Sequence, residues 1–83
     1  MTSSTVPHKL RSIIADVLGL SPDEISAESA VGQTEGWDSF GHLQVILALE
    51  SELGLQFDPA RIPELVTVAK IQQELVGQGV TWD

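Results

Sequence analysis

Apolar residues recur along this chain at the spacing of α-helices, and no segment shows the alternation of a β-strand. The first helical segment runs from about Val6 to Leu18, with a single apolar stripe made by Val6, Leu10, Ile13, Ile14, Val17 and Leu18. Pro7 suits the first turn of a helix, and Gly19 suits the position just after its end. The pattern therefore predicts a helix over 6–18.

A second and more apolar helix is predicted from Ser39 to Leu53, and Gly54 ends it. Its core-facing stripe is expected to consist of Phe40, Leu43, Ile46, Leu47 and Leu53, widened by Val45 and Leu49. A helix with so many apolar residues is expected to be the central one, with neighbours on several sides. Glu50 and Glu52 are expected on its solvent-exposed face.

The remaining elements are short. Ser21 and Pro22 favour a brief helical turn, Asp58 and Pro59 favour a short helix over about 59–65, and Thr67 caps a last helix over about 68–76. The predicted fold is all-α, a small bundle of three main helices and one short helix. We expect one domain over 1–83, with its core at about 6–77, short flexible tails and a tail contact made by Trp82.

The connection from 20 to 38 is longer than the ~12–15 residues usual for a loop without structure, which suggests a function near its end. There Asp38 and Ser39 precede the apolar helix. The ordinary interpretation is an N-cap. A serine at this position is also exposed, and a phosphodiester attached to it would lie in the favourable field of the helix N-terminus.

Composition and charge exclude several classes of function. The 83 residues include 12 Asp+Glu against 4 Lys+Arg and no cysteine. Nucleic acid is therefore not an expected partner, and disulfides, thiolate metal sites and a cysteine nucleophile are excluded. No apolar run approaches the ~20 residues of a membrane span, and the polar start is no secretory signal, so we expect a cytoplasmic protein. Nine acidic residues and no Lys or Arg lie between Arg11 and Arg61, which fits either solubility or docking to a basic partner.

Catalysis and metal binding are not predicted. Two histidines, His8 and His42, are too few for a metal site. Ser39 and His42 share a helical face, as a nucleophile and its base would, but no G-x-S-x-G segment and no third orienting group accompany them. We therefore predict a protein that is not an enzyme.

The chain resembles an acyl carrier protein, the small helical domain that bears a 4′-phosphopantetheine arm. The resemblance extends from about Leu10 to Leu75. It depends on Asp38-Ser39-Phe40 at the start of the second helix, on the run from Leu47 to Gly54, and on Leu65-Val66-Thr67-Val68 before the last helix. The three pieces occur in the family's order and at its spacing.

The resemblance implies that Ser39 is the attachment site of 4′-phosphopantetheine, which a phosphopantetheinyl transferase would transfer from coenzyme A. Acyl or aminoacyl cargo would then be held as a thioester on the arm, loaded by a ligase and used by downstream synthase enzymes. Asp38 is expected to take part in transferase recognition. The residues expected to contact partner enzymes are Trp37, Phe40, His42, Glu50 and Glu52. We expect a freestanding monomer.

Departures from the family pattern bear on the subtype. Carriers of fatty-acid synthesis have acidic residues soon after the serine, whereas this chain has Gly41, His42 and Gln44. The segment from Gly36 to Leu43 is similar to discrete carriers of specialised, natural-product-like pathways, and we expect that subtype. A carrier of fatty-acid synthesis and a peptidyl carrier domain are alternatives, as is an acidic interaction module without a prosthetic group, in which Ser39 is only a cap.

Overall fold

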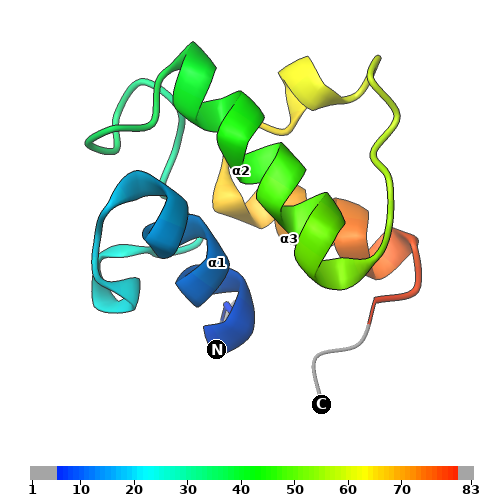
Figure 1. Ribbon diagram of the computed structural model, residues 1–83, viewed down its shortest axis with the longest axis horizontal. Helices are drawn as coiled ribbons and strands as arrows, with labels where there is room; N and C mark the ends of the chain where they lie inside the picture. Colours follow the sequence, from blue (N-terminus) through cyan, green and yellow to red (C-terminus); the bar gives the residue numbers. More distant parts are fainter. Residues whose placement is uncertain (1–5, 81–83) are drawn as a thin grey trace.

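The described part of the chain contains three α-helices and two short 3-10 helices in the computed structural model shown in Figure 1. In chain order they are α1 (His8–Leu18), η1 (Pro22–Glu24), α2 (Ser39–Leu53), η2 (Ile62–Glu64) and α3 (Val68–Gly77). The structure describes residues 6–80. The expected tail contact of Trp82 and the expected flexibility of the outermost residues lie outside them. The prediction of a small all-α bundle is confirmed.

Local capping explains where the long helices begin and end. Asp38 caps α2, and Gly54 ends it with a φ of 66°. The Thr67 hydroxyl accepts a hydrogen bond of 3.1 Å from the backbone N–H of Lys70 at the start of α3. Gly19 ends α1 with a φ of 74°. Because glycine adopts this left-handed conformation without steric cost, these ends could be predicted from the sequence.

The short helix predicted over 59–65 is smaller than expected. The Asp58 carboxylate accepts a hydrogen bond of 2.9 Å from the backbone N–H of Ala60, which forms a turn, and only Ile62–Glu64 is helical, as the 3-10 helix η2. Pro63 within η2 has no backbone N–H to donate. An α-helix therefore does not develop in this segment.

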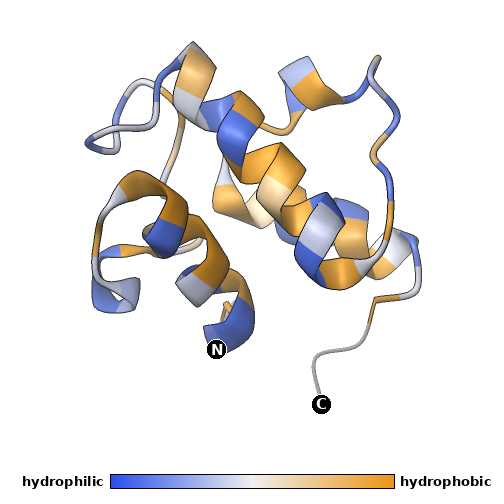
Figure 2. Cartoon of the chain, viewed as in Figure 1, coloured by the Kyte–Doolittle hydropathy of each residue, from blue (hydrophilic) through white to orange (hydrophobic). Residues whose placement is uncertain are grey.

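The core lies where the three α-helices meet. Figure 2 shows apolar residues in all three helices, including the middle of α2. Residues with almost no exposed surface come from each helix: Leu10 and Ile14 of α1, Val45, Ile46 and Leu49 of α2, and Val68, Ile71 and Leu75 of α3. Each of the three helices therefore contributes one face to a shared core.

The expected core face of α2 is partly wrong. The sequence pattern predicts Phe40, Leu43 and Leu47 in the core, but 70%, 49% and 53% of their surface is exposed. Val45 and Leu49, assigned to the margins, are fully buried. A helix that is apolar on all sides has no preferred direction of burial. The elements that pack against it decide which residues are covered.

Backbone hydrogen bonds hold the long connection between η1 and α2 against the start of α3. The N–H of Val31 donates to the carbonyl of Val66, and the N–H of Val68 donates to the carbonyl of Ser29, both at 3.0 Å. The connection therefore approaches α2 along a defined path, which determines how α2 begins.

Candidate functional site

Ser39 is the first residue of α2, and its side chain is exposed. Its hydroxyl has no hydrogen-bond partner within residues 6–80. In Figure 1 this end of α2 lies at the upper edge of the molecule, after the long connection. The hydroxyl is thus available for attachment of a large group.

Asp38 organises the start of the helix beside Ser39. Its carboxylate accepts a hydrogen bond of 2.8 Å from the backbone N–H of Gly41, the third residue of α2. Within the described part of the chain, the N–H groups of Ser39 and Phe40 donate to no protein acceptor. Free N–H groups at a helix N-terminus favour a negatively charged group nearby. A phosphodiester on Ser39 fits this arrangement.

Gly41 has a steric purpose that the sequence did not reveal. A Cβ atom on this residue would lie 2.5 Å from the carbonyl oxygen of Gly36. Gly36 itself has a φ of 81°, a conformation that favours glycine. The two glycines let the connection pass tightly over the first turn of α2. Glycine is a poor helix former, and here its low helix propensity accompanies a close backbone contact.

Trp37 and His42 were expected to contact partner enzymes, and the structure corrects this expectation. Only 1% of the surface of Trp37 and 7% of that of His42 is exposed. The indole N–H of Trp37 donates to Nδ1 of His42 at 3.2 Å, and Nε2 of His42 lies 3.0 Å from the carbonyl oxygen of Ile62. Both side chains therefore belong to the interior. They lie beneath the point where the connection meets the start of α2, which we call the Ser39 junction.

Three apolar side chains remain exposed along α2, and we call them the α2 apolar surface: Phe40, Leu43 and Leu47. They lie at positions i, i+3 and i+7, which share one face of a helix. From Ser39 to Leu49 the helix has no Asp, Glu, Lys or Arg. An exposed cluster of this kind is typical of an interaction surface. Phe40 remains a docking candidate, and Leu43 and Leu47 are additions that sequence reasoning missed.

Glu50 and Glu52 lie at the opposite end of α2. At 1.5 Å per residue, Glu50 is about 16 Å along the helix from Ser39. Its carboxylate accepts a hydrogen bond of 2.8 Å from the backbone N–H of Phe57, so it fixes the chain after α2. Glu52 is exposed. The structure therefore does not bring these two acids to the Ser39 junction.

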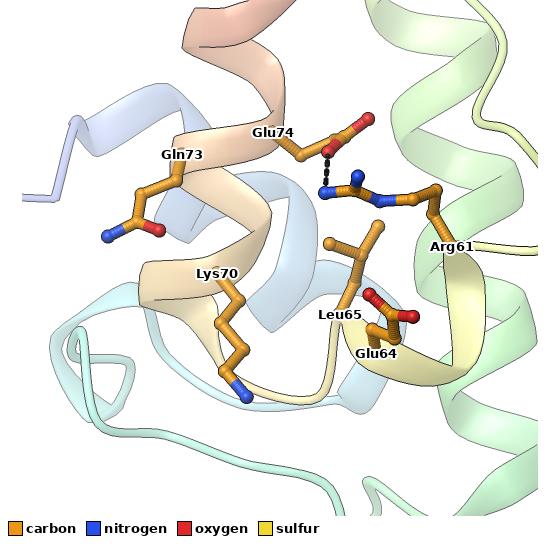
Figure 3. A pocket seen from close by; sticks show the side chains of 6 residues that line it. All are labelled: Arg61, Glu64, Leu65, Lys70, Gln73 and Glu74. Carbon is orange, nitrogen blue, oxygen red and sulfur yellow. Dashed lines mark hydrogen bonds and ion pairs between the residues drawn. The ribbon is translucent and has the colours of Figure 1, made fainter.

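A surface pocket between η2 and α3 has a lining of mixed charge, shown in Figure 3. Arg61 and Lys70 face Glu64 and Glu74 across it, and the Arg61 guanidinium forms an ion pair of 2.8 Å with Glu74. Ser39 is not among its lining residues. The balanced charges give this pocket no preference for an anion or a cation.

Two further observations concern metals and membranes. Within residues 6–80, no group of three His, Asp or Glu side chains is arranged to hold a metal ion. Over the same residues, no helix has the length and apolar character needed to cross a membrane.

Comparison with known proteins shows that the chain is similar to carrier proteins over most of its length. The family model described as "Phosphopantetheine attachment site" matches residues 8–75, which include Ser39. An acyl carrier protein of Thermosynechococcus vestitus is 28% identical over 71 residues, covering 86% of this chain and 88% of the relative. One from Akkermansia muciniphila is 27% identical, covering 86% and 89%. One from Nitratidesulfovibrio vulgaris is 35% identical over 54 residues, covering 65% and 71%.

Proposed function

The chain belongs to the acyl carrier protein family, whose members have a phosphopantetheine attachment site, and on this premise we propose that Ser39 is the residue that bears the arm. The observation that supports this assignment is an exposed, unengaged serine hydroxyl at the start of a capped 15-residue helix. Ser39 also lies within the matched residues 8–75. Asp38, which shapes this helix start, is proposed to help the transferase recognise the serine.

The family membership defines what the protein does in general terms. It carries a covalently attached 4′-phosphopantetheine and is not a catalyst. When bound, the arm supplies a thiol that holds cargo as a thioester, which the cysteine-free chain cannot do with its own side chains. Carriers of this family interact with phosphopantetheinyl transferases and with synthase enzymes. We propose that residues 1–83 form one carrier domain, with its core at about 6–77, and that it acts as a monomer.

Mass spectrometry of the intact protein tests the assignment of Ser39. Incubation with coenzyme A and a broad-specificity phosphopantetheinyl transferase is expected to add the mass of one phosphopantetheine group. Ser39→Ala should abolish the increment, because the attacking hydroxyl is gone. Ser51→Ala is the matched control, since Ser51 is another exposed serine of α2, and it should be modified normally.

Two results would contradict this assignment. An unchanged mass with several transferases would favour an interaction module without a prosthetic group. An increment that persists in Ser39→Ala would assign the arm to another residue.

We further propose that the protein is a discrete carrier of a specialised pathway and that partner enzymes dock on the α2 apolar surface. This surface begins beside Ser39, which the transferase must reach to attach the arm. Its lack of acidic residues up to Leu49 is unlike the acidic helix of fatty-acid carriers. The acidic residues elsewhere then contribute to solubility and long-range attraction more than to contact.

The subtype is tested with an enzyme that transfers malonyl groups to carriers of fatty-acid synthesis. Once the arm is attached, this chain should be acylated much more slowly than a fatty-acid carrier under the same conditions. Equal rates would favour the fatty-acid alternative. Efficient loading by an amino-acid-activating ligase would favour a peptidyl carrier.

A further inference from the structure

The buried imidazole of His42 joins three segments of the chain. Its Nδ1 lies 3.2 Å from the indole nitrogen of Trp37, in the connection before α2, and its Nε2 lies 3.0 Å from the carbonyl oxygen of Ile62, in η2. His42 itself belongs to the first turn of α2. One side chain therefore links the segment before α2, α2 itself and η2.

The partners of His42 define which of its nitrogen atoms bears the proton. An indole nitrogen can only donate, so Nδ1 must accept. A carbonyl oxygen can only accept, so Nε2 must donate. His42 is thus the neutral tautomer with its hydrogen on Nε2, and both ring nitrogens are used.

These interactions hold the residues on both sides of Ser39, the proposed attachment site. Trp37 lies two residues before Ser39, and His42 lies three residues after it. Between them, the Asp38 carboxylate accepts the N–H of Gly41 at 2.8 Å. The carbonyl of Trp37 also accepts a hydrogen bond of 2.8 Å from the N–H of Gly32, within the connection. Ser39 is exposed, but the residues on both sides of it are fixed from within.

We propose that His42 is a positioning residue for attachment of the arm, acting through Trp37 to hold Ser39 in the conformation that the transferase binds. The inference rests on the proposed function of Ser39. Without an acceptor, the indole N–H would be buried and unsatisfied, which favours movement of Trp37 toward water. The connection before Ser39 would move with it, and a smaller fraction of the protein would be competent to bind the transferase.

Substitution of His42 by Asn or by Gln tests its two hydrogen bonds one at a time. The Asn carboxamide places its oxygen near the position of Nδ1, and the longer Gln carboxamide places its nitrogen near that of Nε2. His42→Asn therefore retains an acceptor for Trp37, His42→Gln retains a donor toward Ile62, and His42→Leu retains neither. Trp37→Phe removes the indole donor and keeps most of the apolar volume.

Kinetics of arm attachment supply the main test. Because a buried donor that loses its partner favours conformations in which it reaches water, we expect the apparent KM of the transferase for His42→Leu to rise about tenfold with little change in kcat. His42→Asn should remain close to the wild type, whereas His42→Gln should resemble His42→Leu. Trp37→Phe should show a smaller rise than His42→Leu, because it leaves no unsatisfied indole.

An NMR readout distinguishes positioning from general stability. In the wild type, the indole N–H of Trp37, assigned by its loss in Trp37→Phe, should exchange slowly with solvent, and the ¹⁵N shifts of His42 should show hydrogen on Nε2. Slow exchange should persist in His42→Asn and disappear in His42→Leu. Ile71→Val in the core of α3 is the control, because it lowers stability and should leave KM and indole exchange unchanged.

Each outcome has a defined meaning. If the wild type is never modified, the assignment of Ser39 fails. If the wild type is modified and folded His42→Leu and His42→Gln have the wild-type KM, His42 is only a core residue and the inference is overturned. If His42→Leu does not fold, the comparison of His42→Asn with His42→Gln decides, and equal KM values for these two variants reject the inference.

Discussion

The two faces of α2 have similar residues in opposite environments. Leu47 and Leu49 are two positions apart, yet 53% of the surface of Leu47 is exposed and none of that of Leu49. Val45, Ile46 and Leu49 pack inside the bundle, while Phe40, Leu43 and Leu47 face water. The buried face stabilises the fold, and the exposed apolar face beside Ser39 is available to other proteins. Hydrophobicity alone therefore does not distinguish a buried residue from an exposed one on this helix.

Leucine-to-alanine substitutions give the largest expected difference between the two faces. Leu49→Ala removes fully buried atoms and leaves a cavity, so we expect the free energy of unfolding to fall by about 2–5 kcal/mol. Leu47→Ala removes atoms that are half in water, and its effect should stay within about 0.5 kcal/mol. Urea denaturation followed by circular dichroism measures both. Equal losses would mean that Leu47 is covered in solution, for example by a second copy of the chain.

Glycine-to-alanine substitutions test the buried side of the first turn. In a helix, alanine is more favourable than glycine by about 1 kcal/mol, so such a substitution ordinarily raises the free energy of unfolding. Gly41→Ala should instead lower stability by about 1–3 kcal/mol, because its Cβ would lie 2.5 Å from the backbone oxygen of Gly36. The clash involves backbone on both sides, so no side-chain rotation relieves it.

Gly77 is the matched control for this substitution. It is the last residue of α3, and a Cβ there would meet nothing within 4 Å. Gly77→Ala should leave stability unchanged or raise it by up to about 1 kcal/mol. If Gly41→Ala is more stable than the wild type, the connection can move away from α2 at little cost. The contacts around Ser39 would then not hold the start of α2 in one position.

Features determined by local sequence could be predicted, and features determined by tertiary contacts could not. The bounds of α2 follow from Asp38 and Gly54, because a cap acts within one turn of the helix. The buried face of α2 depends on where the other elements pack. The Trp37–His42 pair depends on the path of a long connection. Ser39 becomes the candidate attachment residue through its position before the apolar helix and through the family resemblance, whereas the contacts around it required the structure.

The smallest expected effect comes from the exposed face, and it concerns binding. Phe40→Ala should leave the free energy of unfolding nearly unchanged, because 70% of the side chain's surface is exposed. If partner enzymes dock on the α2 apolar surface, the same substitution should cost about 1 kcal/mol of binding, or about a fivefold rise in the transferase KM. Thermal unfolding and transferase kinetics on one preparation measure the two quantities.

Salt dependence decides between apolar and acidic docking in this experiment. Salt screens charges and leaves apolar contact largely intact, so the loss in Phe40→Ala should be similar at low and high ionic strength. Glu52→Gln, at the acidic end of α2, should change KM by less than Phe40→Ala does. If Glu52→Gln has the larger effect and high salt abolishes it, the acidic residues make the contact. The exposed leucines and Phe40 would then need another partner, and the division of α2 into a stabilising face and a docking face would be wrong.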